Sequence, residues 1–108
     1  MAGRLIRGEV RLMRFPAPDK ERPAVILTQD SAIEYLNTVT VAPVTSSIRG
    51  IPSQVVLDEA DGMKAPCVVN LHNIVTLPKH YVGSRIAQLN RERVEQICAA
   101  MNFALGRS

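Results

Sequence analysis

Two short apolar runs constrain what this chain can fold into more than any other feature. Residues 23–27 read PAVIL and residues 39–44 read VTVAPV, with a polar break between them. Both runs are rich in β-branched residues and too short for helices of ordinary length. We therefore expect two buried strands at the centre of the fold, with the other elements arranged around them.

A polar group stands at one end of each run. Arg22 lies just before the first run, on the loop side of Pro23, and Thr45, Ser46 and Ser47 follow the second. If the two strands are antiparallel, the start of the first and the end of the second lie at the same edge of the sheet. A guanidinium and a cluster of hydroxyls at one rim would suit a phosphate. Taken singly, an arginine before a strand is usually a solvated charge, and a Thr-Ser-Ser run is usually turn chemistry.

Further short strands and one helix complete a predicted single domain over residues 1–108. Local patterns predict four further strands, over residues 7–14, 54–57, 66–75 and 84–88. Between them we expect a loop over 15–20, an acidic turn over 58–64, and a loop or single helical turn over 76–83. A turn of helix within 28–37 would be capped by Asp30 or Ser31. A terminal helix is predicted from the N-cap Asn90 to the stop at Gly106, with an apolar stripe of Val94, Ile97, Cys98, Met101 and Leu105. These elements predict a mainly β fold: a small barrel or curled sheet of mostly antiparallel strands with the helix packed on it.

The composition argues against several classes of protein. No apolar run approaches the ~20 residues of a membrane-spanning helix, and the N-terminus lacks the apolar centre of a secretory signal, so we expect a cytoplasmic protein. A net charge of +3 allows a nucleic-acid partner without requiring one. Cys67 and Cys98 are expected to be reduced core thiols. Two cysteines and two histidines do not suggest a zinc cage, and no metal or cofactor is expected.

The motifs of this chain occur in an order that resembles one family. RGEV at 7–10, RPAVIL at 22–27, VAPVTSS at 41–47 and VVNLHNIVTL at 68–77 are followed by an amphipathic helix that ends in ALG. This ordered set resembles the MazF/PemK toxins of bacterial type II toxin–antitoxin pairs. The resemblance covers almost the whole chain, and it implies a small SH3-like barrel with a C-terminal helix.

The resemblance also implies an activity. Members of the family are sequence-specific, metal-independent endoribonucleases that cleave single-stranded RNA, form homodimers and are neutralised by a cognate antitoxin. By motif position, the catalytic arginine and threonine of the family fall on Arg22 and Thr45. Where many members carry an acidic residue and a glutamine in a late strand, this sequence has His72 and Asn73.

The chemistry of metal-free RNA cleavage fits these two residue types. The 2′-hydroxyl attacks the adjacent phosphorus and gives a 2′,3′-cyclic phosphate and a 5′-hydroxyl end. A guanidinium such as Arg22 can grip two phosphate oxygens and stabilise the developing charge, but it keeps its own charge and is a poor proton acceptor. Thr45 would hydrogen-bond the scissile phosphate. The general base stays open: Glu21 and His72 have suitable chemistry, and the alternatives are bound water or a purely electrostatic mechanism without a base.

The candidate RNA contacts are Lys20, Ser46, Ser47, Arg49, His72, Asn73 and Thr76. Two other functions compete with RNA cleavage. A non-enzymatic toxin of the gyrase-poison type would bind a protein target through its C-terminal helix. A module that binds RNA without cleaving it would keep the fold and lose the activity.

Overall fold

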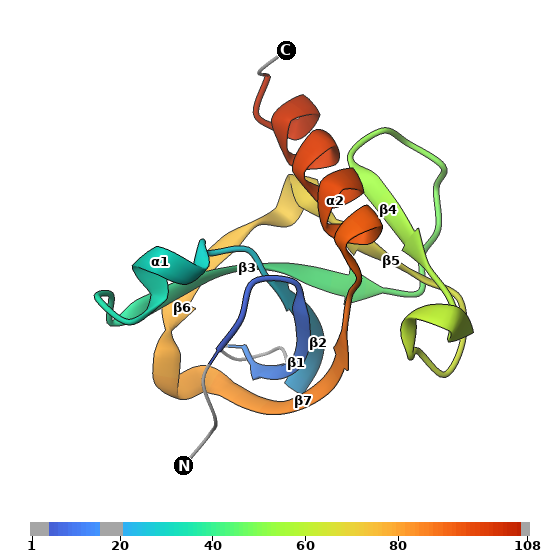
Figure 1. Ribbon diagram of the computed structural model, residues 1–108. Helices are drawn as coiled ribbons and strands as arrows, with labels where there is room; N and C mark the ends of the chain where they lie inside the picture. Colours follow the sequence, from blue (N-terminus) through green and yellow to red (C-terminus); the bar gives the residue numbers. More distant parts are fainter. Residues whose placement is uncertain (1–4, 16–20, 107–108) are drawn as a thin grey trace.

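Seven strands form one sheet in the computed structural model, which describes residues 5–15 and 21–106 (Figure 1). The strands are β1 (Glu9–Arg14), β2 (Glu21–Ile26), β3 (Thr38–Thr45), β4 (Gln54–Leu57), β5 (Cys67–Asn70), β6 (Val75–Pro78) and β7 (Val82–Gln88). The helices are α1 (Asp30–Ile33) and α2 (Arg91–Ala104), and single turns of 3₁₀ helix form η1 (Glu59–Asp61), η2 (Leu71–Asn73) and η3 (Lys79–Tyr81). Among these helices, none is long and apolar enough to cross a membrane.

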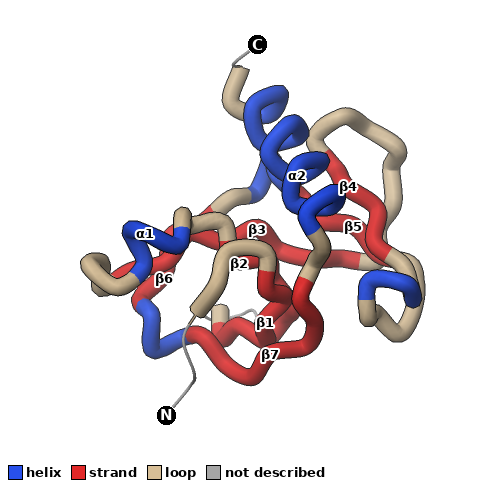
Figure 2. The backbone as a smooth tube through the Cα atoms, viewed as in Figure 1, coloured by secondary structure: helices blue, strands red, loops and turns tan. Residues whose placement is uncertain are grey.

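Every strand pairing in the sheet is antiparallel. The hydrogen-bonded order is β4-β5-β3-β2-β1-β7, and β6 pairs with the first half of β3. Figure 2 shows the strands curving round from β4 and β5 to β7, and α2 lies beside β4. The prediction of a mainly antiparallel β fold with a terminal helix is confirmed. In the described part of the chain no ladder joins β4 to β7, so the sheet curls without closing into a barrel.

The two apolar runs pair with each other, as predicted. Ala24 stands opposite Pro43 in the β2–β3 ladder, and the ladder continues through Ile26 and Val41. Because Ala24, Ile26 and Val41 are completely buried, a shift of the register by one residue would turn buried side chains to the wrong face of the sheet. One detail was wrong: Arg22 does not precede the strand but lies within β2, where it pairs with Met13 of β1.

The predicted strand over residues 66–75 is not a single strand. β5 pairs with the end of β3, where Val44 meets Val69, and β6 pairs with its beginning, where Val41 meets Val75. Val41 and Val44 are three residues apart in β3, whereas their partners Val75 and Val69 are six residues apart. The turn η2 accommodates the three extra residues, and its Leu71 is buried.

The terminal helix packs its apolar stripe on the sheet. The Asn90 side chain caps it by accepting from the Arg93 N–H at 2.9 Å, and Ile97 and Ala100 are buried in the larger of two core clusters. Leu105, which was predicted to extend the stripe, is instead exposed at the C-cap. The short helix α1 is also capped differently from the prediction: Gln29 is its N-cap, and Asp30 accepts the Arg7 N–H at 2.7 Å.

Candidate functional site

A pocket of about 510 Å³ lies where the end of β3 meets the start of β2. Its lining comes from two strand pairs, one loop and η2, and consists of Arg22, Thr45, Ser47, Arg49, Gln54, Asn70, His72 and Asn73. All of these side chains are polar, two carry a guanidinium, and none carries a carboxylate. A pocket with this lining favours an anionic ligand.

Most of the predicted site residues meet here, although the sequence brings them from distant segments. The residues brought together are Arg22, Thr45, Ser47, Arg49, His72 and Asn73. Ser46 lines an adjoining pocket that also includes Thr45. Thr76 does not join the site, because the break at η2 places it on β6, where its Oγ1 lies 2.8 Å from the Thr40 Oγ1. Lys20 lies outside the described residues.

A chain of side-chain amides holds Thr45, the last residue of β3. The Asn70 Nδ2 donates to the Thr45 Oγ1 at 3.1 Å, and the Gln54 Nε2 donates to the Asn70 Oδ1 at 2.6 Å. Gln54 is oriented by backbone groups, since its Oε1 accepts the Arg49 N–H at 2.8 Å and its Nε2 donates to the Ser47 carbonyl at 3.2 Å. We call this arrangement of Gln54, Asn70 and Thr45 the amide relay.

The amide relay determines what the Thr45 hydroxyl can do. A backbone N–H can only donate and a backbone carbonyl can only accept, so the orientation of Gln54 is fixed, and the orientation of Asn70 follows from it. Asn70 therefore donates to the Thr45 oxygen, and the hydroxyl proton stays available for a ligand oxygen in the pocket. Sequence reasoning did not identify Gln54 or Asn70. The only sequence feature that could have indicated them is a polar amide at one end of an otherwise apolar strand: Gln54 begins β4 and Asn70 ends β5.

His72 is held at the other side of the pocket by a buried hydroxyl. Its Nδ1 lies 2.8 Å from the Oγ of Ser53, which is 6% exposed. The backbone strengthens this contact, because the Leu71 N–H donates to the Ser53 carbonyl at 2.9 Å. This hydrogen bond occupies Nδ1, so Nε2 is the ring nitrogen that can contact a ligand in the pocket.

The adjoining pocket, of about 450 Å³, is largely apolar and contains Cys67 in its wall. Burial raises the pKa of the Cys67 thiol, and the negative charges of Asp61 and Asp58 raise it further. The thiol is therefore protonated at neutral pH and is a poor nucleophile. Both Cys67 and Cys98 are free thiols.

Within residues 5–15 and 21–106, no group of three or more His, Cys, Asp and Glu side chains could hold a metal ion.

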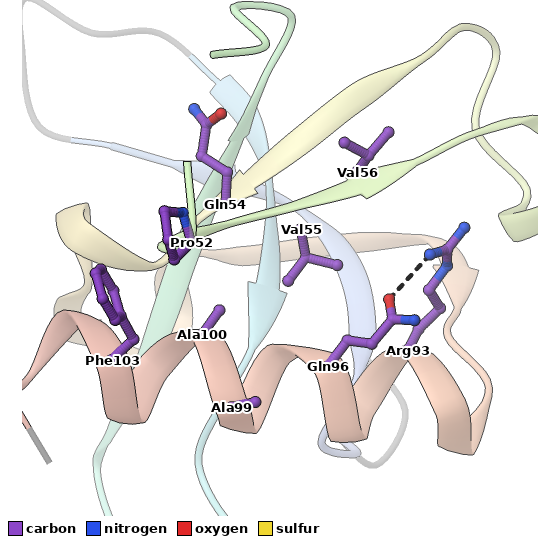
Figure 3. A pocket seen from close by; sticks show the side chains of 9 residues that line it. All are labelled: Pro52, Gln54, Val55, Val56, Arg93, Gln96, Ala99, Ala100 and Phe103. Carbon is purple, nitrogen blue, oxygen red and sulfur yellow. Dashed lines mark hydrogen bonds between the residues drawn. The ribbon is translucent and has the colours of Figure 1, made fainter. Parts of the chain in front are cut away.

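A third pocket, of about 440 Å³, lies between β4 and α2 (Figure 3). Its floor is mainly apolar, with Val55, Ala100 and Phe103, while Arg93 donates to the Gln96 Oε1 at 2.9 Å at one end. Apart from Gln54, it shares no lining residue with the polar pocket. None of the described site residues predicted from the sequence lines this third pocket.

Comparisons with known proteins agree on one family. The model for the PemK-like, MazF-like toxin of type II toxin–antitoxin systems matches residues 6–105. The endoribonuclease MazF3 of Mycobacterium tuberculosis is 39% identical over 86 residues, which cover 80% of this chain and 84% of that protein. The probable endoribonuclease MazF2 of the same organism is 32% identical over 101 residues, covering 93% and 97%.

Solved structures give the same result for the fold. The Mycobacterium tuberculosis toxin MazF-mt6 superposes with a TM-score of 0.85 at 30% identity, covering 93% of this chain and 98% of that one. A mycobacterial endoribonuclease solved with its cognate antitoxin superposes with a TM-score of 0.84, covering 94% of this chain and 95% of that one. Its identity to this chain is 24%, so this match concerns the fold alone.

Proposed function

The chain belongs to the PemK/MazF-like toxins of type II toxin–antitoxin systems, and we propose that it is a sequence-specific, metal-independent endoribonuclease that acts on single-stranded RNA. The family predicted from the ordered motifs is confirmed, and the matched relatives include the endoribonuclease MazF3. We extend two further properties to this chain as proposals: it forms a homodimer, and a cognate antitoxin neutralises it.

One observation supports the proposed chemistry above all others. Arg22 of β2 and Thr45 of β3 line the same polar pocket, although they are far apart in the sequence. In our proposal the Arg22 guanidinium binds the scissile phosphate and stabilises the charge that develops as the 2′-hydroxyl attacks. The Thr45 hydroxyl, whose proton the amide relay leaves available, donates to a second oxygen of that phosphate.

The remaining polar side chains of the pocket fit a role in binding the RNA. Ser47, Arg49 and Asn73 line the same cavity as Arg22 and Thr45. Arg49 supplies a second positive charge for the backbone, while Asn73 has an amide that can read a base edge. Ser46 reaches the adjoining pocket, whose apolar wall suits the face of a base.

The activity is tested by incubating the purified protein with a defined RNA in EDTA. We expect discrete fragments that end in a 2′,3′-cyclic phosphate and begin with a 5′-hydroxyl, because the reaction uses the RNA's own nucleophile. Labelling the new 5′ ends without prior phosphatase treatment would identify them. Intact RNA, together with a loss of gyrase supercoiling, would instead favour the protein-binding toxin.

Variants of Arg22 and Thr45 test the assignment of the site. Arg22→Ala and Thr45→Val should each lower the single-turnover cleavage rate by about 10²–10³, the usual loss for one donor to a developing oxyanion. Arg91→Ala and Thr38→Val are matched controls, since both residues are exposed and neither lines the polar pocket. Wild-type rates in either site variant would refute the assignment.

A further inference from the structure

We infer that His72 is the general base of the RNA cleavage and that Ser53 is the residue that positions its imidazole. This inference rests on the proposed function, because it assigns a role within that reaction. It concerns a step in which neither Arg22 nor Thr45 has a role: removal of the proton from the attacking 2′-hydroxyl.

The lining of the polar pocket singles out the histidine. The other described lining residues carry guanidinium groups, hydroxyls or amides. At neutral pH a guanidinium has no lone pair to accept a proton, and hydroxyl and amide oxygens are far too weakly basic. An imidazole nitrogen accepts a proton readily in this range. Among the described residues of this lining, His72 alone can therefore act as the base.

The position of the ring is built into the fold. Ser53 is buried, its hydroxyl holds Nδ1 at 2.8 Å, and its carbonyl accepts the N–H of the residue before His72 at 2.9 Å. The next residue, Gln54, starts the amide relay that orients Thr45. Ser53, just before β4, and Gln54, its first residue, thus hold the imidazole and the alcohol, which fixes the relative placement of base and phosphate-binding group.

The charges that surround His72 come from two elements. Arg22 of β2 and Arg49 of the loop before β4 line the same pocket, while β3, β4 and β5 contribute Thr45, Gln54 and Asn70, which do not titrate in the working range. The helix α2 packs against η2, and its residues Ile97 and Ala100 share the apolar cluster of Leu71. The two guanidinium groups therefore favour an anionic phosphate beside His72.

The step balances as follows. The 2′-hydroxyl proton passes to Nε2 of His72, and the freed oxygen forms the new bond to phosphorus. The bond from phosphorus to the 5′-oxygen breaks, and that oxygen takes a proton from solvent water. The imidazolium then returns its proton to solvent, so neither a metal ion nor a redox partner takes part.

The test uses a short RNA that contains one cleavage site mapped with the wild-type protein. His72→Gln should lower the single-turnover rate by about 10²–10⁴, as expected for loss of a general base. It should also remove any rise of the rate with pH that comes from deprotonation of an imidazole. His80→Gln is the matched control, because His80 is the other histidine, is exposed and does not line the polar pocket.

A modified substrate separates the base from an acid or a binding residue. When sulfur replaces the 5′-oxygen, the leaving group no longer needs a proton, so a general-acid defect would disappear while a general-base defect would remain. We expect the His72→Gln defect to remain and the affinity for a 2′-deoxy analogue to be unchanged. Rescue by the sulfur substrate, a rate loss matched by weaker binding, or a wild-type rate and pH profile would each overturn the inference.

Ser53 is tested through its dependence on His72. Ser53→Ala should slow the wild-type protein but add nothing to the defect of His72→Gln, because its effect passes through the imidazole. Equal losses in both backgrounds would show a merely structural role and would overturn this part of the inference. Failure of the proposed function is a different result: the wild-type protein itself would leave the RNA intact.

Discussion

Asn70 is the residue on which the orientation of the Thr45 hydroxyl depends. It is 6% exposed, it donates to the Thr45 Oγ1, and its own carbonyl is occupied by Gln54. A carboxylate at this position could not donate. It would accept the Thr45 proton instead and would place a negative charge beside the phosphate.

We therefore expect Asn70→Asp to lower the cleavage rate by at least the ~10²-fold that loss of one phosphate donor costs. The measurement is single-turnover cleavage of a mapped RNA, with thermal unfolding to confirm that the variant folds. Asn102→Asp on the exposed side of α2 is the control for the charge change. A wild-type rate in Asn70→Asp would mean that the amide relay does not determine the function of Thr45.

Single residues of the pocket differed in how well the sequence predicted them. Arg22, Thr45 and His72 lie at the ends of predicted strands or within motifs, so their chemistry was visible. Gln54 and Asn70 were not predicted, because their role arises from pairing across β4 and β5, where they stand directly opposite each other. Such long-range register cannot be read from either strand alone.

Among the secondary-structure elements, η1 is joined to α2 by a buried carboxylate. Burial of Asp61 on its own would raise the pKa of its carboxyl group. Hydrogen bonds from Arg93 and from the Asp58 backbone, together with the charge of Arg93, nevertheless hold the pKa below its ordinary value of 3.8. The Arg93 Nε donates to both carboxylate oxygens, at 3.0 and 3.2 Å. The ionised form of Asp61 therefore stabilises the folded state.

Replacing Asp61 by asparagine should lower the free energy of unfolding at neutral pH by about 1.5–3 kcal/mol, the range for a hydrogen bond to a charged group. Because the folded-state pKa is lowered, the stability that Asp61 contributes is present above pH 3.8 and is lost as the pH falls through the folded-state pKa. The difference between wild type and Asp61→Asn should therefore shrink in acid. Urea unfolding at several pH values measures it, with exposed Glu59→Gln as control. A difference that does not change with pH would exclude this role.

The strand β1 shows why patterns of alternation had limited power here. Simple alternation places the charged residues Glu9 and Arg11 on one face of the strand, yet both side chains are buried. β1 lies between β2 and β7 in the curled sheet, and its two charged groups satisfy each other, with the Arg11 Nη2 3.2 Å from the Glu9 Oε1. The sequence predicted the strand itself, but the burial of its polar face depends on how the sheet curls.

For the molecule as a whole, the order of the secondary-structure elements was easier to predict from the sequence than whether the sheet closes into a barrel. The apolar runs, the terminal helix and the family pattern predicted the antiparallel arrangement. The break at η2 and the open edges of the sheet depend on pairing registers, which the sequence does not show.

The groove between β4 and α2 leaves Val56 43% and Phe103 58% exposed. Apolar side chains of this size at a surface are consistent with the proposed homodimer.

We expect the native mass in solution at micromolar concentrations to be twice the chain mass of 11.9 kDa. Light scattering coupled to gel filtration measures this mass independently of shape. A monomeric mass across that concentration range would contradict the homodimer, and it would leave the chemistry of the polar pocket unaffected.

The convergence of Arg22 and Thr45 on one phosphate is tested by a double-mutant cycle in EDTA. Single-turnover rates are measured for wild type, Arg22→Lys, Thr45→Val and the double variant on one mapped RNA. If both groups stabilise the same phosphate, the double variant should lose much less than the product of the two single losses. Losses that multiply as though the residues were independent, or a single variant that cleaves at the wild-type rate, would contradict a shared site.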